Sequence, residues 1–374
     1  MDFQLSEEQQ ALAGLASSVF GDHVTHERLR ELEASSASVF DRVLWSACSQ
    51  AGLLGTVVPE LHGGAGLGLL ELLPVLEEQG RRVAPIPLVE TLVLGALGLV
   101  EFGSAQQQAA LLPGVATGEV VLTAAFAEGV GGDPSVPVMA AEATADGWLL
   151  DGDLDFVTYA AQATRVLVPA QTSSGTIVVL LDPTAVGVEL TELVATNRQP
   201  QARMELRRVT VSTGDVVAGP DRGQEMLVWL AQRASAAWCA VQAGVCDGAV
   251  RMTAAYTSQR KQFDKPIAEF QAVAQRAADA FIDSEMVGLT ARHAVYRLSQ
   301  NLECAREVHV AKFWAGDGGM RAVHAAQHLH GGIGVDLDYP VHRYFLWAKR
   351  IEHTLGTPTR ELLRLGNILA DEPV

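Results

Sequence analysis

The run from Gln259 to Gln271 combines cationic, aromatic and amide side chains around a break in a helical pattern. Pro266 lacks a backbone N–H and disfavours helix at the residue before it, which predicts a turn between two helices. Arg260 offers a fork of cationic donors, and Phe263 and Phe270 offer aromatic faces. Such a turn could hold the phosphates and adenine of a nucleotide cofactor. On spacing alone, a plain helix–helix corner with a solvated arginine is the stronger alternative.

The elements around this turn follow an α, β, α order. Residues 1–118 show helical periodicity, residues 119–220 show short alternating strands with Gly, Pro and Asp turns, and residues 221–374 return to helix. We predict three domains with these boundaries. The long C-terminal helices are expected at Gly223–Ser258, Ala272–Gln300 and Val308–Leu329. The clearest strands are expected at Trp148–Leu150, Arg165–Pro169, Thr176–Leu181 and Val209–Val211.

Composition limits the classes of partner. The 374 residues are 48% hydrophobic and 19% charged, with a formal net charge of -17, which argues against nucleic acid or an anionic membrane as a partner. The stretch Leu88–Val100 is too short and too interrupted to span a membrane, and no secretory signal is evident, so a reduced cytoplasm is expected. The four cysteines include no C-x-x-C pair, so we expect no metal site.

Three stretches together resemble the acyl-CoA dehydrogenase family. They are Ala51–Leu67, the Arg260 run with Asp264 at a family glycine position, and His330–Gly334 followed by Tyr339, Pro340 and Arg343. The resemblance covers nearly the whole chain. It implies an α+β, mainly helical fold with an N-terminal helical domain, a middle β-barrel domain and a C-terminal four-helix-bundle domain. It also implies FAD and acyl-CoA thioesters, usually within a tetramer.

In this family each FAD lies between two subunits, and the resemblance assigns the pyrophosphate and adenosine end to the motifs just named. Glycines let a backbone approach phosphate closely, although a Gly pair can also be a plain helix stop. The family has a glutamine three residues before the Gly331–Gly332 pair. That position is His328 in this chain, with Gln327 beside it, and the choice between them stays open. The implied contacts are Arg260, Phe263, Gln271, Gly331, Gly332 and either Gln327 or His328.

The residues that should remove the α-proton are missing. Dehydrogenation of an acyl thioester needs a carboxylate base, which the family places before Gly-Thr near the C-terminus or on the long helix before the Arg motif. Leu355 and Ala234 occupy these two positions, so we expect no catalytic residue in this chain. Glu225 lies about nine residues before the helix position, more than two turns away. Glu352 lies three residues before the C-terminal position, and a solvated or ion-paired surface residue is the simpler interpretation of it.

The barrel also departs from the family pattern. Residues Leu122–Glu128 lack the Thr-Glu-Pro and Gly-Ser-Asp groups that usually contact flavin and substrate. On the following strand, Phe156 is a candidate flavin-stacking ring and Thr158 a candidate donor to the flavin N5 region, with ordinary core roles as the alternative for both. The adenosine end is thus expected to be intact and the flavin-ring end eroded.

This asymmetry resembles the bacterial α2β2 acyl-CoA dehydrogenases, several of which act on steroid side-chain CoA thioesters. We expect this chain to be the base-lacking subunit, with a second acyl-CoA dehydrogenase-like subunit, an acyl-CoA substrate and an electron acceptor flavoprotein as partners. One alternative is a homotetrameric enzyme with a relocated base. Another is a non-enzymatic scaffold or acyl-CoA-binding subunit.

Overall fold

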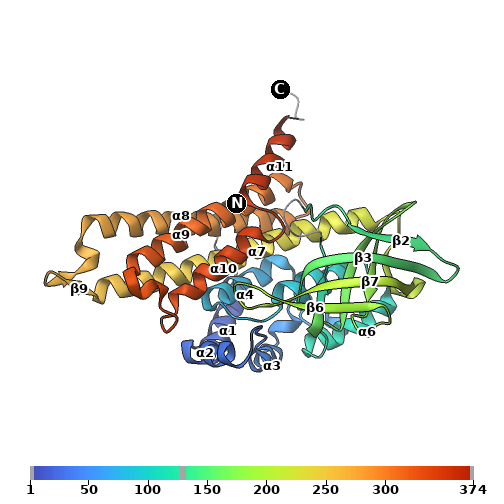
Figure 1. The fold of residues 1–374 in the computed structure, drawn as a ribbon, viewed down its shortest axis with the longest axis horizontal. Helices are drawn as coiled ribbons and strands as arrows, with labels where there is room; N and C mark the ends of the chain where they lie inside the picture. The colour runs from blue at the N-terminus through green and yellow to red at the C-terminus, as the bar shows by residue number, and fades with distance from the viewer. Residues whose placement is uncertain (1–3, 127–131, 371–374) are drawn as a thin grey trace. The chain divides into compact units, whose positions relative to one another are not determined.

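The computed structural model describes residues 4–126 and 132–370, and its elements follow the expected α, β, α order (Figure 1). Helices precede the sheet, and longer helices follow it. The helices before the sheet are α1 (Glu7–His23), α2 (His26–Ser35), α3 (Arg42–Gln50), α4 (Leu69–Arg82), the π-helix η3 (Val89–Leu97), α5 (Gly98–Phe102) and α6 (Ala105–Ala116).

Local sequence signals set the ends of these helices. Ser6 caps α1 in a reciprocal capping box with Gln9, and Asp41 accepts the first free N–H groups of α3. The apolar face expected from Phe40 to Leu54 is not one continuous helix. Gly52 adopts φ +79°, a left-handed conformation that stops α3 and starts a short 3-10 turn.

The middle block is an eight-stranded sheet with the order β6-β7-β3-β2-β4-β5-β8, and β1 pairs with β4. The β1–β4 and β2–β4 pairs are parallel, whereas the other pairs are antiparallel. The strands are β1 (Leu122–Ala124), β2 (Met139–Ala143), β3 (Gly147–Thr158), β4 (Arg165–Thr172), β5 (Gly175–Leu181), β6 (Val188–Val194), β7 (Pro200–Ser212) and β8 (Val216–Ala218).

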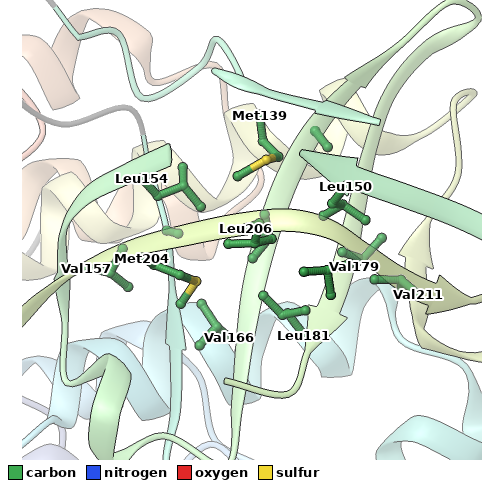
Figure 2. Packing of buried hydrophobic residues seen from close by; sticks show 14 of the residues in the cluster. Met139, Leu150, Leu154, Val157, Val166, Val179, Leu181, Met204, Leu206 and Val211 are labelled. Atoms are coloured by element: carbon green, nitrogen blue, oxygen red, sulfur yellow. The ribbon is translucent and has the colours of Figure 1, made fainter. Parts of the chain in front are cut away.

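The sheet wraps around its own apolar core. Leu150 of β3, Val179 of β5 and Leu206 of β7 are fully buried and point into one cluster with Met139 of β2 (Figure 2). Alternate residues of each strand supply this cluster, since successive side chains of a strand point to opposite faces. The expected barrel interior is therefore present.

The C-terminal helices pack around α9. Both α8 and α10 lie along it, and α11 contacts it as well. The helices are α7 (Gly223–Gln259), α8 (Gln271–Ser299), α9 (Ala305–His330), α10 (Val341–His353) and α11 (Pro358–Ala370). Each of the three long helices begins and ends within a few residues of its expected bounds.

The chain packs as two compact units. One, here called the helical unit, holds the residues before Leu29, Leu73–Ala84 and everything from Ser235 onward. The other, the mixed unit, holds Leu29–Leu72 and Pro85–Ala234. The two domain boundaries predicted at residues 118 and 220 stay a prediction.

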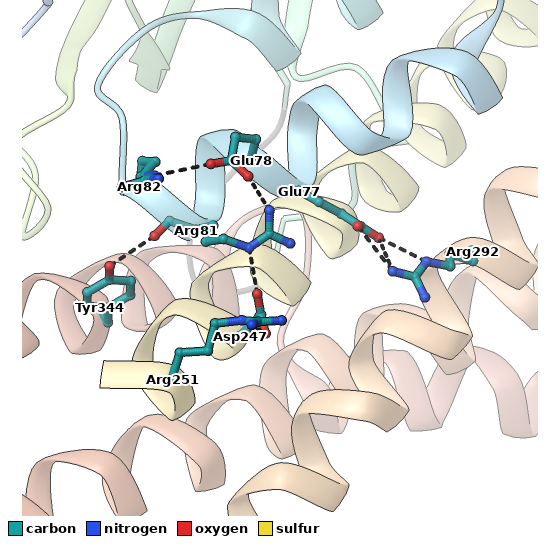
Figure 3. A network of polar contacts seen from close by, with 8 residues as sticks. All are labelled: Glu77, Glu78, Arg81, Arg82, Asp247, Arg251, Arg292 and Tyr344. Carbon is teal, nitrogen blue, oxygen red and sulfur yellow. Dashed lines mark hydrogen bonds and ion pairs between the residues drawn. The ribbon is translucent and has the colours of Figure 1, made fainter. Parts of the chain in front are cut away.

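Charged residues tie α4 to its neighbours within the helical unit (Figure 3). Arg292 of α8 donates two hydrogen bonds to Glu77, at 3.0 and 3.1 Å, and Arg81 contacts Asp247 of α7 at 2.5 Å. The Tyr344 hydroxyl of α10 donates to the Arg81 carbonyl oxygen at 2.9 Å. Burial raises the pKa of Tyr344 to about 12, so its hydroxyl keeps the proton that it donates.

Candidate functional site

The Arg260 turn is a short hairpin inserted between α7 and α8. Its strands β9 (Lys261–Gln262) and β10 (Lys265–Pro266) are joined by Phe263 and Asp264, with φ +53° and +63°. Two successive left-handed residues are what a tight hairpin of this kind requires, and Asp tolerates this conformation better than most residues. The Arg260 N–H donates to the Tyr256 carbonyl, and the Ile267 N–H donates to the Arg260 carbonyl, both at 2.8 Å.

The side chains of this turn face outward. Phe263 is 88% exposed and meets Phe270 edge-on, with ring centroids 6.2 Å apart. Phe270 is half-buried under the Lys265 ammonium, which lies 4.5 Å from its ring centroid. Arg260 and Gln271 are exposed, and Gln271 begins α8. Arg260 and Phe263 therefore lie on one turn, and Gln271 opens the helix that follows it.

The Gly331–Gly332 turn ends α9. Gly331 adopts φ +63° and ψ −139°, a conformation that essentially only glycine reaches. A Cβ at either glycine would meet no atom within 4 Å in the described part of the chain, so both backbone segments are open to a ligand. His328 is exposed and Gln327 half-buried, so the choice between these two stays a prediction.

The ends of α7 and α9, the helices that lead into the two turns, meet through aromatic rings in the helical unit. Tyr256, one helical turn before Arg260, stacks on His330, the residue before Gly331, with ring centroids 4.5 Å apart. The sequence analysis assigned no role to either ring. The signals were the four-residue spacing of Tyr256 from Arg260, which places both on one helix face, and an aromatic residue directly before the Gly pair.

Leu355 lies in a loop that a buried lysine holds. Leu355 is 4% exposed with φ +60°, and Lys312 of α9 is fully buried beneath the same loop. The Lys312 ammonium donates to the carbonyl oxygens of Ile351, Glu352 and Gly356 at 3.0, 3.3 and 2.9 Å. A cation at this end of α10 satisfies carbonyls that no helical N–H reaches. The loop is rigidly built, but its side chain at 355 cannot accept a proton.

The second base position is equally apolar. Ala234 of α7 is fully buried, and the neighbouring Arg233 guanidinium lies over the Trp229 ring at 3.7 Å from its centroid. The two nearest carboxylates are ion-paired, which was expected for Glu352. Glu225 contacts Arg222 at 3.2 Å, and Glu352 contacts Lys349 at 2.7 Å.

The candidate flavin-ring residues lie on β3 in the mixed unit. Phe156 is 42% exposed with φ +61°, at a register shift between β3 and β7. Thr158 is 9% exposed, and its carbonyl accepts the Thr123 hydroxyl at 2.8 Å. The departing segment Leu122–Glu128 is described as far as Phe126, so Ala127 and Glu128 lie outside the described residues.

Comparison with protein-family models assigns the chain to a family. Residues 6–119 match the model of the acyl-CoA dehydrogenase N-terminal domain, and residues 221–367 match that of the acyl-CoA dehydrogenase C-terminal domain. The chain belongs to the acyl-CoA dehydrogenase family. Both the Arg260 turn and the Gly331–Gly332 turn lie within the matched C-terminal domain, and their contact with a cofactor stays a prediction.

Similar proteins match over the full length of the chain. Acyl-CoA dehydrogenase FadE27 of Mycobacterium tuberculosis is 38% identical over 381 residues, covering 100% of both chains. The crystal structure of the ChsE4–ChsE5 complex from Mycobacterium tuberculosis matches with a TM-score of 0.94 and 38% identity, also covering 100% of both chains. A variant of the Tcur3481–Tcur3483 steroid ACAD matches with a TM-score of 0.90 and 42% identity over 98% of each chain.

FAD is the cofactor of acyl-CoA dehydrogenases, and this chain fits one end of it. The open backbone of Gly331 and Gly332 can approach phosphate, and the exposed Arg260 and Phe263 offer a cation and an aromatic face nearby. No helix among the described residues is long and apolar enough to cross a membrane. Across residues 4–126 and 132–370, no group of three or more His, Cys, Asp or Glu side chains could hold a metal ion.

Proposed function

We propose that this chain is the base-lacking subunit of an α2β2 FAD-dependent acyl-CoA dehydrogenase. One observation carries the proposal: the Arg260 and Gly331–Gly332 turns are open and well formed, while Leu355 and Ala234 fill both base positions with buried apolar side chains. A chain that can bind the nucleotide but has no base needs a second subunit to remove the α-proton. The names of the similar structures, a ChsE4–ChsE5 complex and a two-part steroid ACAD, support a heteromer and a steroid side-chain substrate.

In this proposal, Arg260, Phe263 and Gln271 bind the pyrophosphate and adenosine end of FAD together with Gly331, Gly332 and one of Gln327 and His328. The reaction forms a C=C bond in the acyl thioester. A carboxylate of the partner subunit would take the α-proton, and FAD, once bound, would supply the two-electron oxidation by accepting the β-hydride, with an acceptor flavoprotein as the final oxidant. Phe156 and Thr158 are proposed as residual ring-end contacts of this chain.

The surface of α8 supports a protein partner. Phe281, Ile282 and Leu289 are large apolar residues of α8 that are 55%, 58% and 41% exposed. Large apolar side chains exposed along one helix are often covered by a partner. We assign this face to the second acyl-CoA dehydrogenase-like subunit.

The first test is reconstitution. We expect the chain alone to hold little FAD and to lack activity, and the complex with its partner to hold FAD and to oxidise a steroid side-chain acyl-CoA. A chain that binds stoichiometric FAD and turns over substrate by itself would sink the proposal. In that case Glu225→Gln and Glu352→Gln would show whether either carboxylate is a relocated base.

The second test concerns the clamp. Arg260→Ala should weaken FAD binding by the complex by about tenfold to a hundredfold, since hydrogen bonds to a charged group contribute about 1.5–3 kcal/mol each. Arg251→Ala is the control, because Arg251 is an exposed arginine of the preceding helix α7, where it pairs with Asp247. Equal FAD affinity in both variants would favour the scaffold alternative instead.

A further inference from the structure

Three aromatic rings form a stack at the junction of the two turns. His330 lies 4.5 Å from Tyr256 with an interplanar angle of 24°, and 5.1 Å from Tyr339, measured between ring centroids. Tyr256 and Tyr339 meet edge-on at 6.0 Å. His330 is only 3% exposed, so its ring is the buried centre of the stack. The rings come from α7, from the end of α9 and from the segment before α10.

The hydrogen bonding of His330 fixes its tautomer. Its Nδ1 lies 2.7 Å from the Ala326 carbonyl oxygen, and because a carbonyl only accepts, Nδ1 carries the hydrogen. The buried Nε2 has no hydrogen-bond partner among the described residues. In the neutral ring Nε2 carries a lone pair, and burying an unpaired acceptor costs less than burying a charged donor. Protonation would bury an N–H with no acceptor.

The groups around the ring favour the neutral form. Burial lowers the pKa of His330 below its ordinary value, and the bond to Ala326 opposes this only in part. The titratable groups packed against the ring are Tyr256 and Tyr339. Burial raises the pKa of Tyr339, so that phenol brings no negative charge to the imidazole near neutral pH.

The stack joins the residues that lead into the two turns. The Tyr256 carbonyl accepts the N–H of Arg260 at 2.8 Å, so a shift of Tyr256 moves the first residue of the hairpin. His330 is bonded covalently to Gly331, whose N–H donates to the His328 carbonyl. Gly334 packs closely against the end of α9, since a Cβ there would lie 2.6 Å from the Gln327 carbonyl oxygen and 3.3 Å from the Cβ of His330.

We propose that His330 is a positioning residue that sets the Gly331–Gly332 turn against the Arg260 turn through its stack with Tyr256 and Tyr339. This inference rests on the proposed function, because the two turns act together only if both hold one nucleotide. His330 itself does not touch the ligand, as its ring is covered. Its contribution is the fixed spacing between the arginine and the open glycine backbone.

The experiment compares His330→Phe and His330→Ala in the reconstituted complex. Phenylalanine keeps a stacking ring without a titratable nitrogen, whereas alanine removes both aromatic pairs. His330→Ala should weaken FAD binding about tenfold at about pH 8, the size expected for two aromatic pairs, and should speed hydrogen exchange of residues 331–335 in the FAD-free complex. His330→Phe should stay close to wild type in both measurements. His353→Ala, a change at an exposed histidine, is the control.

The pH profile separates positioning from simple stability. As pH falls below about 6.5, the ordinary pKa of histidine, wild-type FAD affinity should drop, because the ordered turn disfavours the protonated ring. In His330→Phe this drop should be absent. The inference is overturned if His330→Ala binds FAD like wild type, or if His330→Phe is as weak as His330→Ala. If Arg260→Ala also leaves FAD binding unchanged, the proposed function itself has failed.

Discussion

Gly244→Ala should separate α4 from α7 and destabilise the helical unit. A Cβ at Gly244 would lie 1.8 Å from the Glu77 carbonyl oxygen and 2.7 Å from the Arg81 nitrogen, and a Cβ at Gly80 would lie 1.8 Å from the Val241 carbonyl oxygen. Carbon–oxygen contacts need about 3.3 Å, so the helices would have to move apart by about 1.5 Å. A gap of that size removes about half or more of the dispersion energy between facing atoms.

Overpacking of a close contact costs about 1–3 kcal/mol, and the loosened Glu77–Arg292 and Arg81–Asp247 contacts add to this. The gain in helix propensity from Gly to Ala returns about 1 kcal/mol. We therefore expect the free energy of unfolding to fall by about 2 kcal/mol or more, measured by urea denaturation followed by circular dichroism.

Gly14→Ala is the matched control for this prediction. Gly14 lies inside α1, is exposed, and a Cβ there would meet no described atom within 4 Å. This variant should gain about 1 kcal/mol from helix propensity alone. The steric reasoning is refuted if Gly244→Ala leaves stability unchanged or raises it as Gly14→Ala does.

Two further predictions concern local chemistry. Asp264→Gly should stabilise the hairpin by up to about 1 kcal/mol, because glycine adopts φ +63° without strain, and a lower urea midpoint than wild type would contradict this. Burial raises the pKa of the Cys48 and Cys239 thiols to about 12. Iodoacetamide at about pH 8 should therefore alkylate them only after urea is added, as read by mass spectrometry. Their contribution to stability is complete below pH 9 and is lost as pH rises toward 12, since the unfolded thiols ionise first; flat stability across that range would count against it.

Periodicity and turn residues predicted most of the fold. The bounds of α7 fall near their expected positions, because Gly223 begins the helical pattern and the hairpin that contains Pro266 interrupts it before α8. The strands predicted at Arg165–Pro169 and Thr176–Leu181 lie within β4 and β5, because each carries a run of apolar residues bounded by turns. β6 was missed, since its residues are half-buried or exposed and Glu and Thr interrupt its apolar residues.

Side-chain relations between distant segments could not be predicted. Lys312 sits in an apolar helical pattern, and only the fold shows that three carbonyls surround it. The stack of His330 on Tyr256 joins residues 74 positions apart, by the difference of their numbers, and no local signal encodes that distance. The motif residues were predictable because glycine, proline and arginine carry their conformational and chemical meaning locally.

The burial of Lys312 also means that chemical modification of this lysine can report when α10 and its loop separate from α9. The sequence contains four lysines, and the other three, Lys261, Lys265 and Lys349, are exposed or half-buried. An amine-reactive reagent will therefore add to three lysines in the folded protein, and a fourth adduct will appear only when α10 and its loop leave α9. Two of the three accessible amines, Lys261 and Lys265, lie in the hairpin that follows Arg260. One mass spectrum can therefore report cofactor binding, as protection of these two lysines, and C-terminal unfolding, as modification of Lys312.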